Sequence, residues 1–108
     1  MNPHDLMVEI LAVYQKHGWQ VRRLLLKPET RAQLDLTNFP DGLRLDEASV
    51  DAMWVSRASH GGREAWELRL LAEQPYALFE TFETDETEEQ REELRGEMEA
   101  RMREYAER

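Results

Sequence analysis

The first apolar pattern in the chain has the period of an α-helix. Five residues fall on one face at helical spacing: Leu6, Met7, Ile10, Leu11 and Tyr14. Asn2 suits the N-cap and Pro3 the first helical position, while Gly18 suits the residue after a helix. The pattern therefore predicts a helix over residues 3–17.

The middle of the chain alternates apolar and polar residues around a pair of glycines. Two strand-forming runs, 50–58 and 64–71, flank the pair Gly61-Gly62. Such a pair is typical of a β-hairpin, because tight hairpin turns need residues with positive φ. The sequence therefore predicts that these runs are neighbouring antiparallel strands.

The register of this hairpin decides which side chains share a face. With the two glycines as the loop, Val55 lies opposite Leu68 and Met53 opposite Leu70, and we expect this apolar face to be buried. The other face then brings together four residues of mixed chemistry: Trp54, Ser56, Glu67 and Arg69.

Weaker patterns predict the remaining strands. Residues 19–26 form a strand whose Arg22-Arg23 pair breaks the alternation and indicates a bulge or burial of both faces at the far end. Residues 76–84 form a last strand, which we expect to be covered on both sides near its start. Residues 28–48 are the least readable part of the chain. A turn signal stands at 39–42, whereas 28–34 could form a short helical turn and 43–45 a short strand.

The C-terminal segment predicts a second long helix, from about residue 85 to 105. Thr87 and Gln90 have the spacing of a capping box. Its apolar stripe is narrow and consists of Leu94, Met98, Met102 and Tyr105. This stripe either packs on the sheet of the same chain or forms a seam with a second copy.

Together these patterns indicate a single α+β domain over residues 1–108. We expect an N-terminal helix, a mainly antiparallel meander of about four strands, and a C-terminal helix. The length is that of one domain, and 41% hydrophobic residues suffice for one core.

Charge narrows the possible partners. The net charge is −9, and residues 80–108 hold twelve acids and five bases, a net of −7. An acidic surface repels phosphates, so we expect no nucleic-acid partner.

No apolar run approaches a membrane span, and there is no cysteine, so we expect no membrane partner and a cytoplasmic location. The acid run 83–93 is either a solvated helix start or a dock for a basic partner.

Catalytic and metal-binding signals are weak. The three histidines, His4, His17 and His60, lack the spacing of metal ligands, and no glycine-rich phosphate loop is present. We therefore expect no catalytic residues, no cofactor and no metal.

The favoured function is a non-enzymatic protein-binding module. Exposed tryptophan beside arginine is typical of interface anchors, so Trp54, Ser56, Glu67 and Arg69 are candidate partner-binding residues. Met98 and Met102 are candidates through the helix seam, and the two apolar groups together suggest a homodimer. The alternative for Trp54 is that a helix of the same chain covers it.

The order of elements and the acidity resemble those of small acidic secretion chaperones, and this resemblance implies an adaptor- or chaperone-like role in binding proteins. The alternative function is a small-molecule-binding or enzymatic domain with a pocket between sheet and helix.

Overall fold

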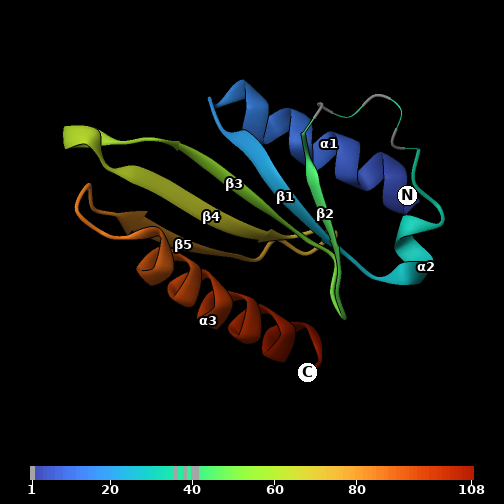
Figure 1. The fold of residues 1–108 in the computed structure, drawn as a ribbon. Coiled ribbons are helices and arrows are strands. Elements are labelled where there is room, and N and C mark those ends of the chain that lie inside the picture. Colours follow the sequence, from blue (N-terminus) through green and yellow to red (C-terminus); the bar gives the residue numbers. More distant parts are fainter. Residues whose placement is uncertain (1, 36, 38, 40–41) are drawn as a thin grey trace.

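The chain folds into one curved sheet with a long helix on each face (Figure 1). The computed structural model describes residues 2–35, 37, 39 and 42–108. The helices are α1 Pro3–Lys16, α2 Pro28–Arg31 and α3 Glu88–Ala106, with a short 3-10 turn at His60–Gly62. The strands are β1 Gln20–Leu26, β2 Arg44–Glu47, β3 Ala52–Ala58, β4 Glu64–Leu70 and β5 Ala77–Phe82.

The sheet has five strands in the order β2-β1-β3-β4-β5. Strands β1, β3, β4 and β5 pair antiparallel, whereas β2 lies parallel to β1 at the edge. The predicted α+β class and its two long helices are confirmed, but the sheet is mixed rather than a four-stranded meander. The extra strand arises because the chain passes through α2 after β1 and returns to the same edge. No helix in the described part of the chain is long and apolar enough to cross a membrane.

Helix α1 begins and ends where its capping residues predict. The Asn2 side chain accepts a hydrogen bond from the backbone N–H of Asp5 at 2.8 Å, and Pro3 is the first helical residue. Gly18 follows the helix with φ +84°, a conformation that favours glycine.

The region after α1 follows the sequence pattern closely. A register shift between Val21 and Arg23 confirms the bulge in β1, and the last three residues of that strand are buried. The helical turn is present as α2, and the short strand is β2. The turn predicted at 39–42 includes Pro40 and Asp41, which lie outside the described residues.

The predicted hairpin is present, but its register was wrong by one residue. Trp54 lies opposite Leu68, and Val55 lies opposite Glu67. The reason is the turn: five residues, Ser59 to Arg63, connect the strands, and both Gly61 and Gly62 adopt positive φ inside it. The shift places Leu68 on the face of Trp54 instead of the face of Val55.

Each face of the sheet has its own apolar cluster. Under α1, the sheet contributes Leu24, Met53, Val55 and Ala65 to a cluster with Met7, Ile10 and Leu11. Under α3, it contributes Leu25, Ala52, Trp54, Leu68 and Leu70 to a cluster with Met98 and Met102. The hairpin thus has two buried faces, which explains why one apolar face was hard to assign from its sequence.

Helix α3 is held at its start by a capping box and along its length by the sheet. Thr87 and Gln90 exchange side chain to backbone hydrogen bonds of 3.1 and 2.8 Å. Of the two interpretations of the helix stripe, packing on the parent sheet is the one observed, with Met98 and Met102 buried.

Strand β5 is covered on one face only. Phe82 is fully buried beneath α3, but Phe79 on the other face is 57% exposed. The prediction that both sides are covered near the strand's start was therefore wrong. Helix α1 packs against β1, near the other end of the sheet, and leaves this part of the face open (Figure 1).

Candidate binding site

The residues predicted to share a partner-binding face lie on opposite faces of the sheet. Trp54 and Ser56 lie on the α3 face of the sheet and are 0% and 1% exposed. Glu67 and Arg69 lie opposite Val55 and Met53, on the face of α1, and are half-buried. The shared face is therefore a correction that follows from the register, and Trp54 is covered by a helix of its own chain.

Trp54 and the helix methionines serve the interior of this chain. The Trp54 indole N–H donates to the Glu99 carboxylate at 2.8 Å, and its ring packs edge-on against Trp66. Met98 and Met102 fill the space between α3 and the sheet. The homodimer stays a prediction, but the two apolar groups from which it was drawn are not on the surface of the chain.

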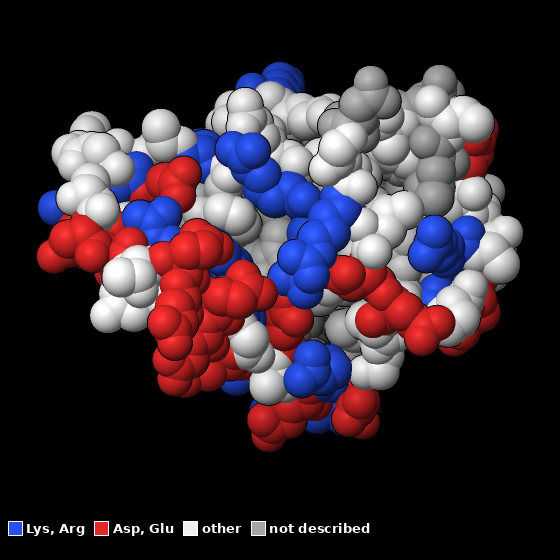
Figure 2. All heavy atoms as spheres, viewed as in Figure 1, with Lys and Arg blue, Asp and Glu red and all other residues white. Residues whose placement is uncertain are grey.

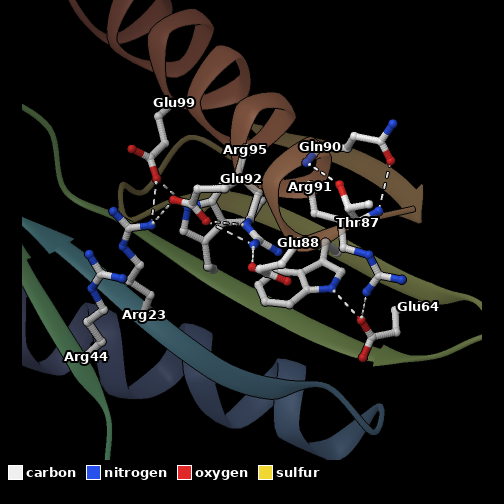
Figure 3. A network of polar contacts seen from close by, with 12 residues as sticks. Arg23, Arg44, Glu64, Thr87, Glu88, Gln90, Arg91, Glu92, Arg95 and Glu99 are labelled. Carbon is white, nitrogen blue, oxygen red and sulfur yellow. Dashed lines mark hydrogen bonds and ion pairs between the residues drawn. The ribbon is translucent and has the colours of Figure 1, made fainter. Parts of the chain in front are cut away.

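A network of ion pairs joins α3 to the sheet (Figure 3). The Arg95 guanidinium lies 4.5 Å from the centroid of Trp66 and contacts the carboxylates of Glu88 and Glu92. The Arg91 guanidinium lies 5.5 Å from the centroid of Phe82 and donates to Glu64 at 2.6 Å. These arginines are occupied by their own chain.

The same network reaches β1 through Arg23. Its guanidinium pairs with Asp46 at 2.5 Å and with Glu99 at 3.4 Å. Burial acts to lower the pKa of Arg23, but the bond to Asp46 and the nearby acids outweigh it and raise the pKa above its ordinary value. The α3 side of the sheet is therefore an interface of apolar contacts and ion pairs within the chain, in which the Arg91 Nε alone among the described buried side-chain nitrogen and oxygen atoms lacks a hydrogen-bond partner.

The opposite face carries an open groove of about 610 Å³ between α1 and β4. Leu6, Ile10, Val13 and Tyr14 line its helix wall, among other residues, and Val13 is 53% exposed. Arg69 lines its sheet side. The groove forms because α1 packs on β1 and leaves part of β4 uncovered, so that one side of the helix and the surface of β4 become its two walls.

Glu67 lies beside the groove rather than in its lining, and helix α1 positions its side chain through Tyr14. The Tyr14 hydroxyl donates a short hydrogen bond to its carboxylate. Burial and this bond raise the pKa of Tyr14 well above its ordinary value. Tyr14 therefore remains a hydrogen-bond donor to Glu67 throughout the physiological pH range.

Phe79 extends this surface onto β5. It lies directly opposite Glu67 across the β4–β5 pair, so both side chains leave the same face of the sheet. With Val8 and Val13 it is one of the large apolar residues that the described chain exposes. Val8 lies on α1 but does not line the groove. Sequence reasoning missed Phe79 because it expected cover on both sides of β5.

Two arginines at the groove lack an acidic partner. Within the described residues, neither Arg57 nor Arg69 has a carboxylate within 4 Å. Arg57 lies over the Trp19 ring at 4.4 Å and donates to the His17 carbonyl at 3.0 Å. Arg69 donates to the Leu70 carbonyl. The guanidinium of Arg57 therefore contacts a ring and a backbone carbonyl, and that of Arg69 contacts a backbone carbonyl.

The outer surface is divided by charge. Figure 2 shows acidic side chains gathered over the first turns of α3 and a basic stripe across the neighbouring part of the sheet. Glu89 and Glu93 belong to the acidic region and have no ion pair in the described part of the chain. This region gives the protein a strongly negative field beside β5.

Within the described ranges, no group of three or more His, Asp or Glu residues is arranged to hold a metal ion. The titratable side chains that line the groove are Glu9, Tyr14, His17, Arg57, Arg69 and Glu73, and Tyr14 is bonded to Glu67 beside it. The arrangement can bind by apolar contact, hydrogen bonding and charge. No protein-family model matches the chain, and no curated protein and no solved structure is significantly similar to it.

Proposed function

We propose that this protein is a non-enzymatic protein-binding module, and that its partner docks on the open half of the sheet beside α1. The observation that carries this proposal is the exposure of Phe79 on the face of the sheet that also holds the 610 Å³ groove. Phe79 lies opposite Glu67, and Glu67 is bonded to Tyr14, which lines that groove. Exposed apolar residues grouped beside a groove are typical of interaction surfaces.

Three acids and two arginines, Arg57 and Arg69, lie at or beside the groove, and the excess of acids favours a basic partner. Glu9, Glu67 and Glu73 lie at or beside the groove, and none of the three has an ion pair in the described part of the chain. The acidic start of α3 adds attraction at longer range (Figure 2). A partner with an apolar side chain flanked by basic residues therefore matches the surface, and its association rate should fall as salt rises.

The test is capture of partners from a lysate of cells that naturally produce this chain, followed by reconstitution with the purified partner. Phe79→Ala should reduce binding by about tenfold or more, the typical loss for an interface anchor. Val8→Ala is the matched control, because Val8 is a similarly exposed apolar residue outside the groove.

Two results would contradict the proposal. One is a reconstituted complex whose affinity Phe79→Ala and Val8→Ala leave equally unchanged. The other is the absence of any saturable protein partner while both variants remain folded. The basic character of the partner is supported if the wild type binds more weakly at high salt while Phe79→Ala still lowers the affinity there.

A second candidate is a small-molecule-binding domain that uses the same groove. The volume of the groove lies in the range of ligand pockets. In the described part of the chain, the guanidinium groups of Arg57 and Arg69 form no ion pair with a carboxylate, so they can bind an acidic ligand. Val13→Trp should fill the groove and abolish thermal stabilisation by any compound found in a ligand screen. Stabilisation by a compound that persists in this variant would place the compound elsewhere.

A further inference from the structure

Two cross-strand pairs of β4 and β5 have the same chemistry on opposite faces of the sheet. On the α3 face, Glu64 lies directly opposite Phe82. On the open face, Glu67 lies directly opposite Phe79. We propose that the Glu67–Phe79 pair is a receptor for an arginine side chain of the protein partner. This inference rests on the proposed function and names the group that the surface recognises.

The pair on the α3 face shows how such a receptor works. The Arg91 guanidinium donates to the Glu64 carboxylate at 2.6 Å (Figure 3). The same guanidinium lies 5.5 Å from the centroid of Phe82. One planar cation thereby satisfies the carboxylate and covers the aromatic ring. The chain itself supplies this arginine from α3.

The pair on the open face has no such arginine. Trp19, Trp66 and Phe82 each have a guanidinium within 6 Å of the ring centroid, but Phe79 has none in the described residues. Likewise, no arginine or lysine of that part of the chain lies within 4 Å of the Glu67 carboxylate. The ring and the carboxylate are thus available to a cation from outside.

Glu67 is prepared for this role by Tyr14. The tyrosine hydroxyl occupies one carboxylate oxygen, Oε2, and so fixes the side chain while Oε1 remains for a donor. Tyr14 contributes no charge at neutral pH, so its bond does not neutralise the carboxylate, and Arg69 is the nearby charge with which an incoming cation must share this face. A positioned acid loses less side-chain freedom on binding than a mobile one.

The neighbouring residues leave access to the pair. Arg69 is on the same face of β4, but it donates to the Leu70 carbonyl, and the residue opposite it on β5 is Ala77. A guanidinium fits better than an ammonium, because its planar face stacks on a ring while its edge donates to a carboxylate.

The probe for the test is a capped pentapeptide with a central arginine between valines and threonines. Its matched control has citrulline in place of arginine, which keeps the shape and removes the charge. In two-dimensional amide NMR titrations, the arginine peptide should produce saturable shifts at Glu67, Phe79 and their strand neighbours. The citrulline peptide should bind about tenfold or more weakly.

Two variants locate the effect on the protein. Glu67→Gln keeps an acceptor for Tyr14 but removes the charge, so it should lower the affinity for the arginine peptide to that for citrulline. Glu97→Gln removes the same charge from the exposed side of α3 and should leave the affinity unchanged. Amide spectra of both variants report that the fold is retained.

Equal losses in the two variants would overturn the inference, because they would show attraction by the net charge alone. Shifts spread over the acidic start of α3, or none at millimolar peptide, would overturn it as well. Each of these results leaves the proposed function standing if Phe79→Ala still weakens the reconstituted complex. Conversely, loss of that complex without dependence on Phe79 removes the proposed function, whatever the peptide does.

Discussion

Two phenylalanines of β5, three residues apart, should lose very different amounts of stability on truncation. Phe82 lies under α3 with none of its side chain in water, next to Trp66 at a ring-centroid distance of 6.2 Å. Phe79 lies on the open face and is 57% exposed. The same substitution, phenylalanine to alanine, therefore measures burial on the two faces of one strand.

The magnitudes follow from that difference. Phe82→Ala removes a fully buried ring and leaves a cavity, which typically costs about 3–5 kcal/mol. It also removes the ring beneath Arg91, worth roughly 0.5–1 kcal/mol more. Phe79→Ala forfeits less than half of the transfer free energy of one side chain, so the expected cost is about 1 kcal/mol or less.

Urea denaturation followed by tryptophan fluorescence gives both values on one scale. Similar m-values in the wild type and the two variants are the control that the unfolded states are comparable. Equal losses of free energy of unfolding, or a larger loss for Phe79→Ala, would refute the assignment of the open face. In that case Phe79 would belong to the core and could not be a docking residue.

Substitutions at four further positions test other parts of the structure. Leu68→Ala should cost about 2–5 kcal/mol in urea melts, because Leu68 is fully buried under α3. Thr87→Ala should cost about 1 kcal/mol by removing the capping box, and the helical circular dichroism near the melting midpoint reports it. Arg95→Met should cost less than Arg95→Ala, since a straight apolar chain retains contact with the aromatic rings. Burial and a hydrogen bond raise the pKa of Tyr14, so stability should be full below pH ~10 and fall above it as the unfolded chain ionises, and Tyr14→Phe should remove this fall.

The helices and their ends could be predicted because they depend on local signals. The apolar spacing of α1, the caps at Asn2 and Thr87, and the glycine after α1 act within a few residues of the chain. The bulge at Arg22-Arg23 was readable for the same reason, since it breaks a local alternation.

The hairpin register could not be predicted with the same security. Its turn contains five residues rather than two or four, and both neighbouring strands carry apolar residues on both faces. When two helices cover the two faces of a sheet, alternation no longer identifies a single interior. The edge strand β2 was underestimated because its parallel pairing depends on contacts distant in sequence.

The candidate site was missed because its members are brought together only by the fold. Tyr14 and Glu67 are 53 residues apart in the sequence, and Phe79 joins them through strand pairing. The sequence did single out Glu67, but it grouped this residue with Trp54 through the wrong register. The sequence did carry one signal for Phe79, because it is the one aromatic residue of the last predicted strand on the face opposite Tyr76 and Phe82.

Photo-crosslinking from the open face tests the central claim most directly. The crosslinking amino acid p-benzoyl-phenylalanine is placed at position 79, at position 13, or at position 8 as the exposed control outside the groove. Positions 79 and 13 should give the same discrete protein adduct, identified by mass spectrometry, and position 8 should not. An adduct from position 8 of equal yield, or none from position 79 while position 8 reacts, would contradict docking on this half of the sheet.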